Sequence, residues 1–168
     1  DVTLVCGPLS VTPPAFVKTV NVVSAQDMFD AVTALAPKSD LIFKAAAVAD
    51  YTPAEYNDQK MKKSDNDLSI PLKRTQDILK YLGEHRTDGQ VICGFSMETQ
   101  NMIENSKRKL QSKNIDMICA NNLKTEGAGF GVDTNVITVI TKSEVKELPL
   151  QSKESVANAI LDESLKLL

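Results

Sequence analysis

Short apolar runs, separated by segments with helical periodicity, are the feature that most constrains the fold of this chain. The runs at residues 41–43, 91–95 and 117–120 contain no charged or amide side chain, so a sheet built from them should be covered on both faces. Residues 24–36 and 101–113 place apolar or small side chains on one helical stripe. Alternating strands and helices of this kind predict an α/β fold with a mainly parallel sheet between two helical layers. The 168 residues are enough for one domain with its own core, so residues 1–168 are expected to form a single domain.

Local signals predict where several helices begin. Ser24 is followed three residues later by Asp27, which is a capping-box arrangement. Thr75 is expected to cap a short helix that carries Ile78, Leu79 and Leu82. Ser152 is expected to cap a final helix whose inner side carries Val156, Ile160 and Leu167.

Two β-hairpins are expected as well. Residues 136–141 and 145–150 alternate around a short polar turn and predict a hairpin before the final helix. Leu68, Ile70 and Leu72 alternate with polar residues, and Pro71 places such a strand at a sheet edge. Residues 60–74 are therefore predicted to form an arm that projects from the domain.

Composition narrows the classes of function. The formal net charge is −3, so no overall field favours nucleic acid. No apolar run reaches the length of a membrane span, and no signal-peptide pattern opens the chain. The three cysteines have no CxxC spacing and each lies in an apolar run, which favours reduced core thiols in a cytoplasmic protein.

A ligand crevice is expected where the parallel strands end. In open α/β sheets, ligands bind outside the carboxyl ends of the strands, and here these are residues 45–50, 95–99 and 121–130. The alanines at 45–47 would let a ligand approach the backbone, Asp50 could hold a divalent cation, and lysines at 60, 62 and 63 could neutralise phosphate. This pattern predicts a Rossmann-like fold that binds a metal-bound polyphosphate. A core strand, a solvated loop and a charged edge are the alternative interpretation.

Five ordered segments carry a family resemblance. They read KAAAVADYTPAEYNDQKMKK, LKRTQDIL, GFSMETQN, DMICANNL and GAGFGVDTN. In this order they resemble the bacterial phosphopantothenoylcysteine synthetase (phosphopantothenate–cysteine ligase) family, often the C-terminal half of a bifunctional coenzyme A biosynthesis protein. The resemblance extends over essentially the whole chain.

The resemblance implies a two-step ligation with Mg²⁺. CTP activates the carboxylate of 4'-phosphopantothenate as an acyl-cytidylate and releases pyrophosphate, and the amine of cysteine then displaces CMP. It also implies a homodimer formed through the arm at residues 60–74, and fusion to or association with a flavin-dependent phosphopantothenoylcysteine decarboxylase domain.

The resemblance also assigns residues to the CTP site. Lys60 is similar to the catalytic lysine that promotes acyl-cytidylate formation, and Asp50 to the acidic residue that contacts the nucleotide and its metal. Lys109 and Lys113 match two nucleotide-contacting lysines, on a helix face that would otherwise be interpreted as a solvated basic surface. The other matching positions are the walls around the base and the nucleotide-binding turn: Lys44, Ala45, Ala46 and Phe95, and then Gln76, Asp77, Ile78 and Leu79.

The chain departs from the family pattern at three points. Gln76 stands where the family turn usually has proline, and Asn122 where an aspartate is common. The family's first strand, its Gly-rich loop and an asparagine needed for product formation have no counterpart from Asp1 onward. We therefore expect this chain to keep much of the CTP site but not to complete the ligation alone.

Two other functions fit parts of the sequence. Tyr56 and Lys60 match the Tyr-x-x-x-Lys pair of short-chain dehydrogenases, but they lie in a predicted loop without the upstream serine or the Gly-rich NAD loop. NAD binding measured against CTP binding separates these classes. A nucleotide-binding or dimerisation module without activity is the other alternative, and it would bind CTP without releasing pyrophosphate.

Overall fold

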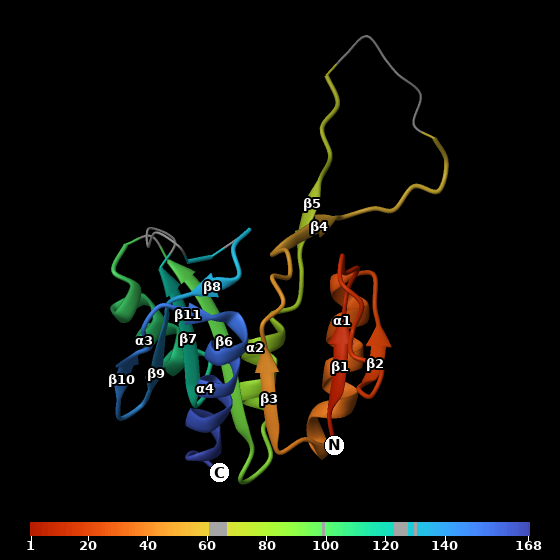
Figure 1. Ribbon diagram of the computed structural model, residues 1–168. Coiled ribbons are helices and arrows are strands. Elements are labelled where there is room, and N and C mark those ends of the chain that lie inside the picture. Colours follow the sequence, from red (N-terminus) through yellow and green to blue (C-terminus); the bar gives the residue numbers. More distant parts are fainter. Residues whose placement is uncertain (61–66, 99, 123–127, 130) are drawn as a thin grey trace. The chain divides into compact units, whose positions relative to one another are not determined.

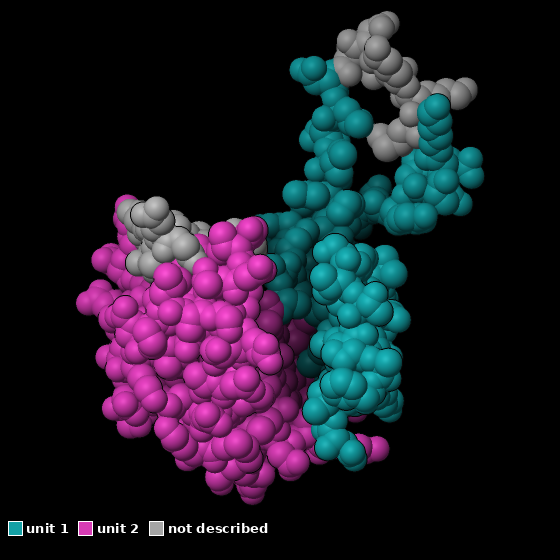
Figure 2. Space-filling view, in the orientation of Figure 1, with its two compact units in different colours: residues 1–32, 46–77 teal, residues 33–45, 78–168 magenta. Residues whose placement is uncertain are grey.

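The computed structural model describes residues 1–60, 67–98, 100–122, 128–129 and 131–168 (Figure 1). It divides the chain into two compact units, residues 1–32 with 46–77 and residues 33–45 with 78–168 (Figure 2). Most of the buried hydrophobic residues belong to the second unit. The predicted α/β fold, with a mainly parallel central sheet and a C-terminal hairpin plus helix, is confirmed.

The second unit is built on a five-stranded sheet. Its order is β10 (Val145–Glu147), β9 (Ile137–Thr141), β7 (Met117–Asn122), β6 (Val91–Glu98) and β3 (Leu41–Lys44). β3, β6 and β7 run parallel, whereas β9 and β10 form the expected antiparallel hairpin. The strands expected at 91–95 and 117–120 continue to 98 and 122, so Ser96, Glu98 and Asn121 belong to the sheet.

Helices cover both faces of this sheet. One buried cluster joins Val156 and Ile160 of α4 (Lys153–Leu165) to Cys93, Met117 and Cys119 of the sheet. Neighbouring positions, whose side chains point to the opposite face, meet α2 (Ile78–Glu84) and α3 (Met102–Ser112). On that face a Cβ at Gly94 would lie 2.6 Å from Leu79 Cδ2. The predicted three-layer arrangement is therefore present in the second unit.

The final helix begins as predicted but its buried stripe ends differently. The Ser152 side chain accepts a hydrogen bond from the backbone N–H of Ser155 at 3.1 Å. Leu167 lies beyond the helix and is 37% exposed, so its predicted inner position is wrong. Ser164 is fully buried in the last turn, and its hydroxyl donates to the Leu161 carbonyl at 2.7 Å. A short ladder between β8 (Thr134–Asn135) and β11 (Gln151–Ser152) precedes α4.

A charged network joins the starts of the parallel strands. Arg86 donates to both oxygens of Asp116, at 3.0 and 2.8 Å, and to the Gln90 carbonyl. Asp116 also accepts from the Ile92 N–H at 2.9 Å. The Gln90 amide donates to the Ala36 carbonyl at 2.7 Å, in the 3₁₀ turn η1 (Ala36–Lys38).

The ends of α2 and α3 approach each other at Gly83. A Cβ at Gly83 would overlap the Lys113 carbonyl oxygen and lie 3.0 Å from the Asn114 carbonyl oxygen. The Asn114 amide donates to the Gly83 carbonyl at 2.8 Å, and Asn114 itself adopts a positive φ of 50°. The absence of a side chain at Gly83 lets the two helix ends come this close.

The first unit begins with two parallel strands and a helix. β1 (Thr3–Cys6) pairs with β2 (Lys18–Asn21), and α1 (Ala25–Leu35) follows, of which the residues from Thr33 onward belong to the second unit. The capping box is confirmed, because the Asp27 N–H donates to Ser24 Oγ at 3.1 Å and the Ser24 N–H donates to Asp27 Oδ2 at 2.9 Å. Hydrogen bonds to the Asp27 carboxylate from the backbone N–H and the side chain of Ser24, and from the Val23 N–H, hold the pKa of Asp27 below its ordinary value.

In the part of the arm that the structure describes, pairing is confined to its base. β4 (Tyr51–Pro53) runs antiparallel to β5 (Leu72–Arg74). Leu68 and Ile70 are exposed and lie outside any strand, so the strand predicted there is wrong. Thr75 does not cap α2, which begins at Ile78; its hydroxyl donates to the Ala49 carbonyl at 2.6 Å and closes the base of the arm. Residues 61–66, with two of the predicted lysines, lie outside the described residues.

The three cysteines are buried and free, as predicted. Cys93 and Cys119 lie on neighbouring strands with their sulfur atoms 3.7 Å apart, whereas Cys6 belongs to β1. The hydrogen bond to Cys119, together with burial, raises the pKa of the Cys93 thiol strongly. Among the helices the structure describes, none combines the length and the apolar character required to cross a membrane.

Candidate functional site

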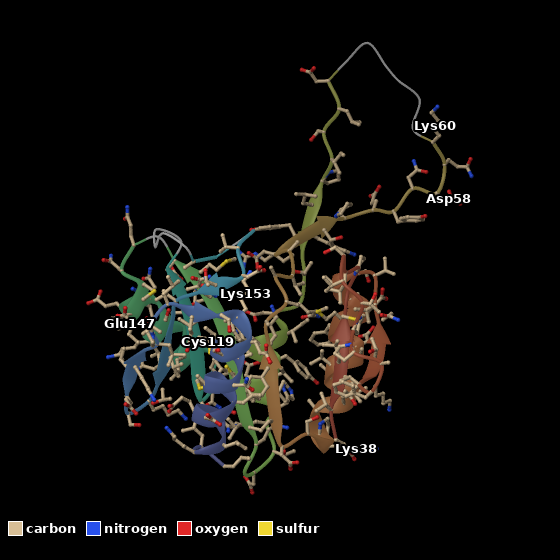
Figure 3. All side chains as sticks on the ribbon, in the orientation of Figure 1. Lys38, Asp58, Lys60, Cys119, Glu147 and Lys153 are labelled. Atoms are coloured by element: carbon tan, nitrogen blue, oxygen red, sulfur yellow. The ribbon has the colours of Figure 1, made fainter. Side chains whose placement is uncertain are left out.

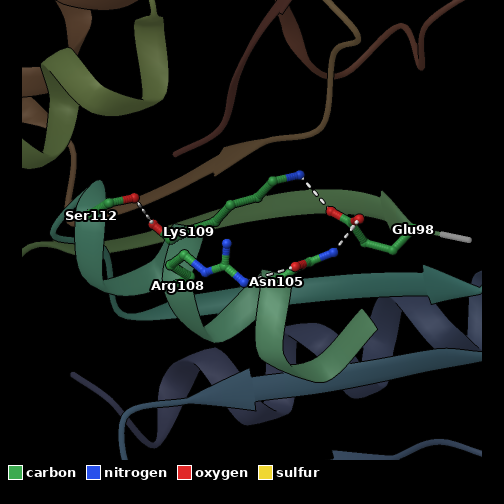
Figure 4. Close-up of a pocket in the computed structure, with 5 residues that line it drawn as sticks. All are labelled: Glu98, Asn105, Arg108, Lys109 and Ser112. Atoms are coloured by element: carbon green, nitrogen blue, oxygen red, sulfur yellow. Dashed lines mark hydrogen bonds and ion pairs between the residues drawn. The ribbon is translucent and has the colours of Figure 1, made fainter. Parts of the chain in front are cut away.

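The end of β6 and one face of α3 form a pocket of about 280 Å³ in the second unit (Figure 4). Its volume lies just below the usual range of small-molecule sites, about 300–1,000 Å³. Four α3 residues and one strand residue line it: Glu98, Asn105, Arg108, Lys109 and Ser112. The pocket lies at the carboxyl end of a parallel strand, where the sequence predicts ligand binding.

Helical spacing explains why these side chains share one face. Residues 105, 108, 109 and 112 are three or four positions apart, so they lie on the same side of α3. The other side carries Ser106 and Leu110, which are fully buried or nearly so. The Ser96 and Ser106 hydroxyls hydrogen-bond at 2.9 Å and fix α3 on β6. Asn101 precedes the helix with a φ of 49° and turns the chain back from the strand.

Hydrogen bonds connect the charged groups of the pocket. Lys109 Nζ donates to Glu98 Oε1 at 2.6 Å, and Asn105 Nδ2 donates to Glu98 Oε2 at 3.2 Å. Arg108 donates to Asn105 Oδ1 at 3.1 Å. The hydrogen bond from Lys109 holds the pKa of Glu98 below its ordinary value, so the carboxylate is charged at neutral pH.

This arrangement can attract an anion. Two cations and one carboxylate line the pocket, which leaves one net positive charge. The Lys109 side chain is 47% exposed, so its ammonium group can meet a solute. Lys113 follows one turn later and forms the C-cap of α3. Both lysines that the family resemblance assigns to the nucleotide therefore lie on or next to this face.

Other predicted site residues of the second unit lie on neighbouring elements. Lys44 ends β3, opposite Gly94 in the register of the sheet, and the exposed Ala45 follows it. Phe95 lies in β6 with 37% of its surface exposed, which leaves its ring accessible. The Ile78 and Leu79 side chains are buried in the core, at 2% and 7% exposure. Any contact of a nucleotide with these two residues would therefore be made by their backbone.

The remaining predicted residues belong to the first unit. At the two ends of the segment 46–77, which contains the arm, four of them are exposed: Ala46, Asp50, Gln76 and Asp77. Lys60 is exposed on the long segment that follows β4 (Figure 3). In this segment Tyr56 and Lys60 lie outside any helix, which argues against the dehydrogenase interpretation.

Among the described residues, carboxylates could bind a metal ion only together with ligands from another molecule, such as substrate phosphates. No group of three or more histidine, cysteine, aspartate or glutamate side chains lies close enough there to hold an ion. Magnesium bound by one or two carboxylates together with substrate phosphates is an ordinary arrangement, and the exposed Asp50 fits it.

Sequence reasoning missed part of the pocket. The sequence patterns assign no role to Glu98, Asn105 or Arg108. The spacing of Asn105 and Lys109, four apart on the face that carries Arg108, was the available signal. Near the end of β7, Asn121 Oδ1 is buried with no hydrogen-bond partner among the described residues. A buried oxygen of this kind is a candidate acceptor for a ligand or a water molecule.

Comparisons with known proteins identify the family of this chain. Residues 1–167 match the family model of the DNA/pantothenate metabolism flavoprotein C-terminal domain. The coenzyme A biosynthesis bifunctional protein CoaBC of Bacillus subtilis is 46% identical over 164 residues, which cover 96% of this chain and 40% of that protein. The CoaBC protein of Haemophilus influenzae is 39% identical, with 99% of this chain and 41% of that protein covered. The chain thus spans about two fifths of the length of these relatives.

A solved structure gives the same result. The crystal structure of the C-terminal domain of CoaBC superposes with a TM-score of 0.79 at 42% identity, over 96% of this chain and 71% of that one. The family model, these two relatives and the solved structure each match 96% or more of this chain. The chain belongs to the family of the DNA/pantothenate metabolism flavoprotein C-terminal domain.

Proposed function

We propose that this chain provides the ligase part of a coenzyme A biosynthesis protein, joining 4'-phosphopantothenate to cysteine at the expense of CTP through an acyl-cytidylate. The observation that carries the proposal is the cationic face of α3 at the end of β6. This face carries Lys109 and is followed by Lys113, the two lysines that the family resemblance assigns to the nucleotide.

The residues divide the chemistry between them. A carboxylate becomes a good electrophile only when one of its oxygens joins a phosphate leaving group, and this requires two anions to meet. The ammonium groups of Lys109, Lys113 and Lys60 would neutralise phosphate charge during that step. Mg²⁺, when held by Asp50 and the triphosphate, would supply further neutralisation.

The nucleotide base would be bound by shape and backbone. Phe95 offers an exposed ring on β6, and aromatic rings stack on bases of any sequence. After Lys44, the exposed Ala45 and Ala46 have small side chains, so a base could approach the backbone there. The turn of Gln76, Asp77, Ile78 and Leu79, which the resemblance assigns to nucleotide binding, leads into α2.

The wider assembly is proposed on the same basis. The arm at residues 60–74 would pair with a second copy, since Leu68, Ile70 and Leu72 are exposed at 66%, 58% and 59%. The bifunctional relatives support fusion to a flavin-dependent phosphopantothenoylcysteine decarboxylase domain.

Calorimetric titration with CTP and Mg²⁺ tests the proposal. We expect Lys109→Gln to weaken CTP binding about three- to tenfold, since one partly exposed hydrogen bond, with a net value of roughly 0.5–1.5 kcal/mol, is removed. Lys146→Gln is the matched control, because Lys146 also pairs with a glutamate of the second unit, at 2.5 Å from Glu163. It should leave CTP binding unchanged, and ATP should bind more weakly than CTP.

Two outcomes would contradict the proposal. Equal CTP affinity in the parent chain and Lys109→Gln would remove the α3 face from the site. CTP binding without pyrophosphate release, with phosphopantothenate and the full-length protein present, would favour a nucleotide-binding module without activity.

A further inference from the structure

Glu98 is an acidic side chain in a pocket suited to anions, and the function proposed above gives it no role. Both of its oxygens are engaged, one by Lys109 at 2.6 Å and one by Asn105 at 3.2 Å. A carboxylate at this place should repel the phosphate groups that Lys109 is expected to bind. Its presence in the pocket therefore needs an explanation.

The two partners of this ion pair differ in exposure. The Glu98 side chain is 15% exposed, whereas that of Lys109 is 47% exposed. Glu98 is held from the helix by Asn105, which also donates to the Gln100 carbonyl at 3.1 Å and accepts from Arg108. The carboxylate is thus fixed at the strand end, and the ammonium group remains open to solvent on the other side.

We infer that Glu98 is a built-in counter-ion of Lys109, which positions the ammonium group at the pocket and competes with incoming phosphate for it. The inference rests on the proposed function, because it concerns the same phosphate-binding face. A ligand binds only to the extent that its phosphate oxygens replace or share the Glu98 interaction. Glu98 thereby lowers the affinity of the face for small anions and favours ligands with several phosphate groups.

Substitution of Glu98 by glutamine isolates this competition. Glutamine keeps the size and one acceptor oxygen of the side chain but removes the negative charge. We expect Glu98→Gln to bind metal-free inorganic tripolyphosphate about two- to fivefold more tightly, which is the size of a partly exposed ion pair.

Glu163→Gln is the matched control. Glu163 lies in α4 of the same unit, is 11% exposed, and pairs with Lys146 and Lys166 at 2.5 and 2.8 Å. Both variants raise the net charge by one, so they change the overall field equally. We expect Glu163→Gln to leave tripolyphosphate affinity unchanged, because its lysines do not line the pocket.

The dependence on Lys109 completes the experiment. In a Lys109→Gln background, Glu98→Gln should give less than half of its gain in affinity, since the group for which it competes is absent. A carboxylate needed only for folding would lower stability in urea and would not tighten tripolyphosphate binding.

The outcomes separate this inference from the proposed function. Equal affinities of Glu98→Gln and Glu163→Gln, or no tripolyphosphate binding by either, would overturn the counter-ion inference. CTP binding in the presence of Mg²⁺ would leave the proposed function standing even then. A selective gain for Glu98→Gln without any CTP binding would support the counter-ion and refute the nucleotide site.

Discussion

Gly83→Ala should destabilise the protein, although a local view of helix propensity predicts the opposite. Gly83 lies inside α2, and replacing glycine by alanine within an exposed helix usually stabilises by about 1 kcal/mol. Here the added methyl group would overlap the Lys113 carbonyl oxygen and lie 2.9 Å from the Lys113 carbonyl carbon. These are backbone atoms, so no rotation of a side chain can relieve the overlap.

The structure gives the size of the effect. Forcing a methyl group into a packed site typically costs about 1–3 kcal/mol, and an overlap with backbone belongs at the upper end. Separation of α2 from α3 would also break the hydrogen bond from Asn114 to the Gly83 carbonyl, at about 1 kcal/mol. After the gain in helix propensity, the free energy of unfolding should fall by about 3 kcal/mol. For a chain of this length that corresponds to a lower melting temperature by roughly 6–12 °C.

Urea unfolding followed by circular dichroism measures this difference. Gly7→Ala is the matched control, since its methyl group would meet only the Val22 carbonyl oxygen, at 4.0 Å. It should change the free energy of unfolding by less than about 0.5 kcal/mol. Because Lys113 is a proposed phosphate contact, Gly83→Ala should also weaken CTP binding. A Gly83→Ala protein as stable as the parent chain would refute the close approach of the two helix ends.

Two further predictions concern charged groups. Arg86→Ala should lower the free energy of unfolding, measured in urea, by about 2–3 kcal/mol, because it leaves the half-buried Asp116 without its bidentate partner. Lys142→Ala removes a 62% exposed partner of Asp116, at 3.6 Å, and should lower it by less than about 1 kcal/mol. Equal losses in the two variants would argue against the network. Hydrogen bonds from Lys146 and Lys166 hold the pKa of Glu163 below its ordinary value. The stabilisation by this carboxylate should therefore be complete above its unfolded-state pKa and lost as pH falls through the lower folded-state pKa. The stability difference between the parent chain and Glu163→Gln should shrink between pH 7 and pH 3, and a constant difference would contradict the ion pairs.

The sequence predicts the parts of this fold that depend on neighbours along the chain. The caps at Ser24 and Ser152 need only a side chain and an N–H three residues away, and both are present. The apolar runs at 91–95 and 117–120 predict buried strands, and every residue of these runs is buried except Phe95, which is 37% exposed.

The predictions that are wrong concern contacts whose partner residues a local sequence pattern does not specify. Alternation at Leu68 and Ile70 resembles a strand, but β4 offers only Tyr51–Pro53 as a partner, so pairing begins at Leu72. Ser164 occupies the buried position that a hydrophobic pattern assigns elsewhere, because its hydroxyl finds the Leu161 carbonyl within the helix.

In the candidate site, too, single residues could be predicted from the sequence but their contacts could not. The resemblance assigned functions to Lys109 and Lys113, but the pairing of Lys109 with Glu98 joins residues eleven positions apart across a strand-to-helix turn. Its 2.6 Å distance depends on how the Ser96–Ser106 contact places α3 on β6. No spacing rule along the sequence contains that information.

The buried thiols provide each unit with its own chemical reporter. Cys6 belongs to the first unit, whereas Cys93 and Cys119 lie in the core of the second, at 1% and 0% exposure. A thiol-specific reagent can modify them only after the surrounding structure opens. Mass spectrometry of the modified peptides would therefore time the opening of each unit separately, in the natural sequence and without an added probe. Ligands that bind one unit should slow labelling of its own cysteines selectively.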